Sequence, residues 1–351
     1  MRRFVALLIC LLAMNCGMAF AEKTLQRYEL EFDERIDRSQ MSDVTSLSPY
    51  KAGYMELNEE TLISTFIGDS AQFESYDAVC ARYINSVAPS QLLLAHDGGY
   101  GFGLRDTPLR NGFDYLYDVH EEECRLDIDY YENHTTEMND ELNELCSAAQ
   151  LEFMSRQDAA ESVKELLADV GIENLEVEYQ FGITKEMISA NDVDNEGNGG
   201  ECRDYYEMGF RQTIDGIPIN SRQYVNKVGI DRYWSEGSSV YAILDERGVT
   251  TLRCVGMLVP ERAGEPMPII SCEQACKTIE DYYSNKFMTY PHVVADVELI
   301  YHDIFTDEPE QFELTPAWAF TIKQVSPYGD GDSYYEYCMI NAYTGEMYVA
   351  A

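Results

Sequence analysis

The residues best suited to hold a metal ion form one short acidic stretch. Three acids alternate ahead of Gly197, as in the first half of an EF-hand calcium loop: Asp192, Asp194 and Glu196. A calcium loop needs a bidentate glutamate at its twelfth position, where this sequence has Arg203. The stretch is therefore a candidate calcium site that lacks its strongest ligand, and a flexible acidic loop is the alternative.

Residue patterns that would support catalysis are missing from the sequence. None of the five histidines lies at a spacing that places two of them on one helix face as zinc ligands. The sequence has no GxSxG nucleophile elbow, no P-loop and no HExxH helix. Carboxylates are too abundant for any one pair to indicate general acid–base chemistry. We therefore expect no catalytic residues and no cofactor.

Eight cysteines follow residue 21, an even number. They are Cys80, Cys124, Cys146, Cys202, Cys254, Cys272, Cys276 and Cys338. In an exported chain an even count permits up to four disulfides, whose connectivity the sequence does not fix. One pairing is predicted, between Cys276 and Cys338, because the small residues of a helix are expected to face the sheet beneath it.

The elements that would position these residues occur twice in the chain. Residues 154–163 and 270–279 match in residue type at each position, and each begins a helix at a serine cap, Ser155 or Ser271. Strands follow in the same order in both copies, and each copy closes with a hairpin that ends at a glycine, Gly248 or Gly345. The first copy is the longer, and we expect its extra residues in a loop between Asn220 and Gly237.

The remaining organisation follows from composition. Residues 22–150 mix strand and helix patterns, including a hairpin that turns at residues 96–99. Three prolines and a glycine mark residues 259–268 as a linker. The predicted fold class is α+β, with a leader (1–21), an N-terminal α+β domain (22–150), a first repeat (151–258), the linker (259–268) and a second repeat (269–351).

Three phrases within the repeats resemble a known group. Residues 210–219 (FRQTIDGIPI), 314–320 (LTPAWAF) and 340–346 (INAYTGE) look like the PepSY-like group, which includes propeptide regions of secreted metallopeptidases and extracytoplasmic regulators of the YycH and YycI kind. The chain is also similar to uncharacterised secreted clostridial proteins. The resemblance covers residues 155–351 and implies one helix packed on an antiparallel sheet in each repeat. It also implies a non-catalytic part that binds or restrains a partner, and it transfers no catalytic residues.

The first 21 residues have the pattern of a cleavable signal peptide. Arg2 and Arg3 precede an apolar stretch that is too short to span a membrane, and residues 19–21 form a small-x-small cleavage site. Glu22 would begin the mature chain, which is expected to be secreted. A lipoprotein anchored at Cys16 is the alternative, although residues 13–15 lack the residues of a lipobox.

Charge then limits the partners. Removing the leader lowers the count of basic residues from 25 to 23, against 63 acids, so the net charge becomes −40. This charge repels nucleic acid and anionic lipid surfaces, so neither is an expected partner, nor is membrane insertion. We expect a secreted non-catalytic module that binds an extracellular or envelope protein or peptide, with cationic ones among the candidates. The alternative is a secreted hydrolase with its site in the N-terminal domain or the interdomain cleft.

Overall fold

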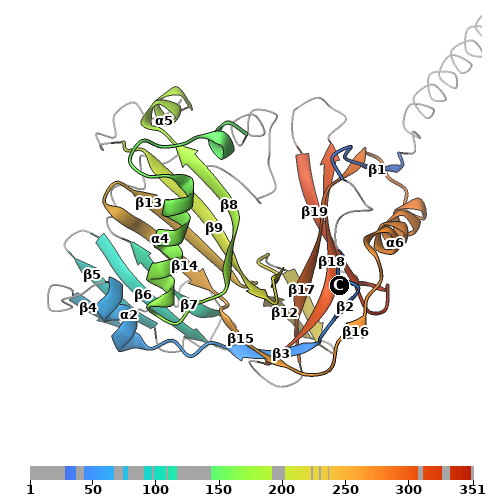
Figure 1. Ribbon diagram of the computed structural model, residues 1–351, viewed down its shortest axis with the longest axis horizontal. Coiled ribbons are helices and arrows are strands. Elements are labelled where there is room, and N and C mark those ends of the chain that lie inside the picture. The colour runs from blue at the N-terminus through green and yellow to red at the C-terminus, as the bar shows by residue number, and fades with distance from the viewer. Residues whose placement is uncertain are drawn as a thin grey trace, which may run out of the picture.

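Two large sheets dominate the computed structural model, and both are antiparallel apart from one short parallel pair of strands (Figure 1). The structure describes residues 28–36, 43–66, 74–77, 91–96, 99–107, 110–116, 144–191, 202–222, 224–228, 231–235, 237–306, 311–325 and 333–348. The fold is α+β, as predicted, with far more strand than helix. Within the described residues, no helix is long and apolar enough to cross a membrane.

The first repeat consists of helices and an antiparallel sheet. Its elements are α4 (Arg156–Ala168), β8 (Leu175–Ile183), α5 (Lys185–Asn191), β9 (Tyr205–Ile214), β10 (Ile217–Pro218), β13 (Ser239–Asp245) and β14 (Gly248–Val255). The four long strands lie in the order β8, β9, β13, β14, and each pairs antiparallel with its neighbour. Helix α4 covers one face of this sheet through Ala159, Val163 and Leu167, all fully buried.

The second repeat has the same plan. Its elements are α6 (Cys272–Ser284), β17 (His292–Phe305), β18 (Gln311–Val325), β19 (Ser333–Asn341) and β20 (Met347–Tyr348). The strands again lie in chain order, and α6 covers one face through Ala275, Cys276 and Ile279. Element by element, α4 corresponds to α6 and the strands β8, β9, β13 and β14 correspond to β17, β18, β19 and β20.

The two predicted serine caps start these helices. The Ser155 hydroxyl accepts a hydrogen bond from the Asp158 amide, and the Ser271 hydroxyl accepts one from the Gln274 amide. In α6 the Gln274 side chain also accepts from the Ser271 amide, which completes a capping box. The caps satisfy helix N–H groups that have no partner within the helix.

In each repeat, an aromatic side chain of the second strand donates a hydrogen bond to the residue just before the serine cap. In the second repeat the Trp318 indole N–H donates to the Ile270 carbonyl at 3.0 Å. In the first repeat the Tyr206 hydroxyl donates to the Met154 carbonyl at 2.9 Å. Both aromatic side chains are almost completely buried. The start of each helix is thereby tied to the sheet on which the helix packs.

Strands from residues 22–150 extend the two sheets of the repeats. The described elements of this region are β1 (Leu30–Phe32), β2 (Ser46–Leu47), β3 (Tyr50–Tyr54), α2 (Glu59–Phe66), β4 (Glu74–Asp77), β5 (Gln91–His96), β6 (Gly99–Thr107) and β7 (Arg110–Leu116). Strand β7 pairs with β14, and β6, β5 and β4 follow it outward, so the first sheet has nine strands. Strand β1 pairs with β17, and β3 pairs with β18. All the described strands of this region except β2 therefore join the sheets of the repeats, and β2 forms a separate two-stranded sheet with a strand from residues 267–268.

Two stretches expected to be irregular contain strands. The predicted linker holds β15 (Leu258–Arg262), which pairs with β3, and β16 (Met267–Pro268), which pairs with β2. A strand tolerates Pro260 here because β15 pairs on one side only among the described strands, so no ladder bond needs the missing N–H. The extra residues of the first repeat form a hairpin of β11 (Tyr224–Val228) and β12 (Asp231–Ser235), where a loop was expected.

Candidate functional site

The outer edge of β19 distinguishes the second sheet from the first. In the first repeat, β14 pairs with β13 along the whole length of β13, from Ser239 to Asp245. The corresponding strand β20 pairs with only two residues of β19, Met339 and Ile340, in the described chain. The part of β19 from Ser333 to Cys338 therefore has a described partner strand on one side only, β18.

Tyr337 presents its main-chain groups to this outer edge. At the end of the strand the Ala342 amide donates to Pro316, the residue before the paired part of β18, while the Asn341 amide donates the other way, to Glu346. Successive residues of an antiparallel strand alternate in direction. The odd-numbered residues of β19 therefore direct N–H and C=O away from β18, and Tyr337 pairs with no residue of β20 (Met347–Tyr348) as far as that strand is described.

Side chains on the α6 face of this edge surround a carboxylate. The Glu336 side chain is 34% exposed. Its Oε2 accepts from the Tyr283 hydroxyl at 2.6 Å and from the Gln324 amide at 3.2 Å. Its Oε1 has longer contacts, 3.8 Å to the Lys286 ammonium and 3.7 Å to the Cys338 thiol. The hydrogen bonds to Oε2 therefore hold the carboxylate in place, while the contacts of Oε1 are long.

The opposite face of the second sheet carries tyrosine rings and a cation from the first repeat. The Arg222 guanidinium lies 4.4 Å from the centre of the Tyr337 ring, and it donates to the Thr321 hydroxyl at 2.8 Å. Met339 is buried on the same face, beside Tyr337. Burial raises the pKa of the Tyr337 hydroxyl, so this ring stays neutral. The face is apolar at its centre and accepts a cation on an aromatic ring.

Arg211 joins the two sheets at the base of this surface. It lies on β9, and its guanidinium contacts Glu176 of β8 at 2.7 Å and Glu298 of β17 at 2.7 Å, with Glu178 at 3.9 Å. The Arg211 side chain is only 14% exposed. One guanidinium thus bridges carboxylates from both sheets.

The charges at this junction stabilise one another. Burial by itself lowers the pKa of Arg211, but the neighbouring carboxylates, Glu298 first, outweigh burial and raise the pKa above its usual value. Burial also raises the pKa of Glu298, and Arg211 opposes that shift. Pairing therefore stabilises the charged form of both groups. The junction therefore fixes the relative position of the sheets and is not a reactive centre.

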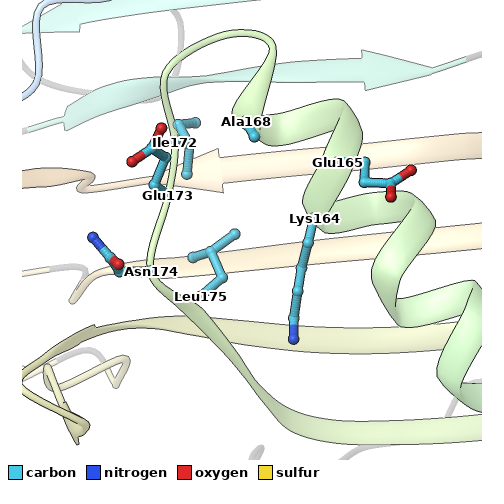
Figure 2. Close-up of a pocket in the computed structure, with 7 residues that line it drawn as sticks. All are labelled: Lys164, Glu165, Ala168, Ile172, Glu173, Asn174 and Leu175. Carbon is cyan, nitrogen blue, oxygen red and sulfur yellow. The ribbon is translucent and has the colours of Figure 1, made fainter.

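A groove beside α4 is a second candidate. It lies between the end of α4 and the segment that enters β8, and its volume is about 340 Å³ (Figure 2). Its lining residues are Lys164, Glu165, Ala168, Ile172, Glu173, Asn174 and Leu175. Lys164 extends toward β8 in Figure 2, and its ammonium pairs with Glu161 at 3.2 Å. This lining contains no histidine, cysteine or serine, and its lysine is already paired with a carboxylate.

The structure does not describe the three acids that the sequence offers as calcium ligands. Asp192, Asp194 and Glu196 fall outside the described residues. Among those that are described, no group of three or more histidine, cysteine, aspartate or glutamate side chains could hold a metal ion. His302 is buried against the Tyr348 ring, and burial lowers its pKa to about 3, so it is neutral at physiological pH.

The predicted Cys276–Cys338 disulfide is not formed. Both residues lie in the core between α6 and its sheet, as expected, but both are thiols. The Cys276 sulfur lies 3.8 Å from that of Cys272, one helical turn away, and the Cys338 sulfur lies 3.8 Å from the Tyr283 hydroxyl. Small residues do face the sheet, but each sulfur packs against a different neighbour.

We expect the five buried cysteines among those described to react slowly with a thiol reagent in the native protein and fully once it is unfolded. Burial raises the pKa of Cys146 to about 11 and that of Cys338 to about 12, and thiols are poor nucleophiles. Alkylation followed by peptide mass mapping, in buffer and in guanidinium, measures both states. Recovery of a Cys276–Cys338 linked peptide from the purified native protein would contradict the structure.

Sequence reasoning missed the residues that define this surface. Tyr337 was visible only as part of a closing hairpin, and Arg211 only within the phrase at residues 210–219. The signal that could have identified the open edge was the difference between the hairpins. In the first repeat residues 248–255 continue as an alternating strand, while in the second the described chain has two paired residues after the turn.

Comparisons with known proteins identify the fold. No family model matches the sequence, and no curated protein matches it. Among solved structures, the chain is similar to an uncharacterized protein from Eubacterium rectale ATCC 33656, with 15% identity, a TM-score of 0.62, and coverage of 88% of this chain and 86% of that one. The two chains share a fold. YycH from Bacillus subtilis aligns over 88% of this chain and 99% of its own, but with 9% identity and a TM-score of 0.20, which is too low to indicate a common fold.

Proposed function

We propose that the protein is an exported, non-catalytic module that binds an extended segment of a partner protein along the outer edge of β19. One observation carries the proposal. The strand that corresponds to β19 in the first repeat has its outer edge fully paired by β14, whereas β19 is paired there at only two described residues. Strand addition uses such an edge, and its affinity comes from main-chain hydrogen bonds.

Sequence features support export and a partner outside the cell membrane. The leader at residues 1–21 has the pattern of a signal peptide, and the PepSY-like resemblance of residues 155–351 implies a part that holds a partner. The net charge of −40 favours a positively charged partner, because opposite charges speed diffusional encounter. We place this partner among extracellular or envelope proteins.

A matched pair of edge variants tests the proposal. Tyr337→Pro removes one outward N–H, and because that N–H faces away from β18, proline leaves the ladder between β18 and β19 intact. Tyr337→Val removes the same ring and keeps the N–H. We expect the native chain (residues 22–351) and Tyr337→Val to capture the same protein from the host's secreted and surface fraction, and Tyr337→Pro to lose it. Equal capture by the two variants would contradict strand addition.

A further inference from the structure

We infer that the segment bound at β19 has a basic residue between two apolar residues and runs antiparallel to the strand. This inference rests on the proposed function and adds the chemistry of its ligand. The geometry of an antiparallel pair determines which ligand residue lies opposite each residue of β19. A residue opposite Tyr337 in an antiparallel strand exchanges both main-chain hydrogen bonds with it, and the next ligand residue lies opposite Glu336 in a non-bonded pair, where side chains are closest.

The two faces of the edge then select different side chains. Directly opposed residues in a sheet share a face. The ligand residue opposite Tyr337 therefore lies over the face that carries the Tyr337 ring and buried Met339, which favours an apolar side chain. The following residue lies on the α6 face beside Glu336, and the residue after that returns to the tyrosine face opposite Tyr335.

The Glu336 carboxylate is oriented so that its Oε1 can accept a hydrogen bond from a cation. Two hydrogen bonds, from Tyr283 and Gln324, orient the carboxylate through Oε2. The Lys286 ammonium is 3.8 Å from Oε1, near the limit of an ion pair, and its side chain is 40% exposed. A lysine or arginine in a non-bonded pair with Glu336 can approach Oε1 more closely, and the orienting bonds limit the entropy lost on binding.

A defined peptide tests the register and the charge separately. The probe is acetyl-Ser-Gly-Thr-Val-Lys-Val-Thr-Gly-Ser-amide, titrated into the native chain by calorimetry. We expect replacement of its Lys by Gln to weaken binding about tenfold, as for the loss of a hydrogen bond between charged groups. In the Glu336→Gln variant, the Lys and Gln peptides should bind equally. The control is Glu261→Gln, an exposed acid on β15 with the same change in net charge, which should keep the tenfold difference.

N-methylation of the probe separates this inference from the proposed function. We expect N-methylation of the Val opposite Tyr337 to abolish binding and N-methylation of the Lys to be tolerated, because only the first blocks an interstrand bond. If this pattern holds while Lys and Gln peptides bind the native chain equally, the basic preference is wrong and strand addition stands. If both methylations act equally, or the probe does not bind, strand addition at β19 is wrong as well.

Discussion

Replacing Arg211 with alanine is expected to lower the free energy of unfolding by about 3 kcal/mol, because it leaves three carboxylates close together without their cation. Two of them, Glu178 and Glu298, have side chains that are 8% and 22% exposed. Water cannot replace the guanidinium fully at such positions, and the carboxylates then repel one another across the two sheets. Urea unfolding followed by circular dichroism measures the loss.

The matched control for Arg211 is an ion pair at the surface. Lys164→Ala removes the partner of Glu161, whose side chain is 56% exposed, and should change the free energy of unfolding by less than about 0.5 kcal/mol. If Arg211→Ala costs no more than this control, the junction does not hold the two sheets together.

The loss in Arg211→Ala should also depend on pH. Burial raises the pKa of Glu298 in the native protein, and removing Arg211 raises it further, because Arg211 opposes that shift. The native state then binds a proton at a higher pH than the unfolded state does, so stability increases as the pH falls through the raised pKa. We expect the difference between the variant and the original protein to shrink as the pH falls from neutral toward about 4.3, the ordinary pKa of glutamate. A constant or growing difference would contradict this electrostatic origin.

Trp318→Ala should be at least as damaging, with an expected loss of about 3–5 kcal/mol. Trp318 is 1% exposed, packs within the core between α6 and its sheet, and donates to the Ile270 carbonyl. Alanine leaves a cavity and also leaves that carbonyl without its donor, so the start of α6 is released from β18. Thermal or urea unfolding of the purified variant gives the magnitude.

Two further variants divide the Trp318 effect. Trp318→Phe retains most of the ring volume and loses the N–H, so it should cost about 1–3 kcal/mol. Phe287→Ala truncates an aromatic residue that is 59% exposed and should have little effect. A loss in Trp318→Ala that is no larger than in Phe287→Ala would show that this aromatic residue does not anchor the helix.

Local signals in the sequence predicted the starts of both repeat helices correctly. A serine cap with a polar residue three positions later is a property of the chain within one helical turn, and both caps are present. The hairpin around residues 96–99 follows from turn chemistry and is also present. These features depend on neighbours in sequence, so their residue types are enough to reveal them.

Long-range pairing could not be predicted in the same way. Strand β3 lies between β15 and β18, which are more than 200 residues away along the chain, and nothing in the sequence of residues 50–54 names those partners. Arg211 meets Glu298 across 87 positions. A charged residue in a strand has the same local pattern whether it faces solvent or a second sheet, so the junction appears only when both sheets are placed.

Strand addition at β19 requires the Tyr337 amide to bond to the ligand, and hydrogen exchange measures that amide directly. In the isolated protein, we predict fast exchange at Tyr337 and slow exchange at Cys338, whose N–H points toward β18. Addition of the Val-Lys-Val peptide should slow exchange at Tyr337 and leave Cys338 unchanged. An unchanged rate at Tyr337 under conditions where the peptide is bound would show that the ligand lies elsewhere and would contradict strand addition at β19.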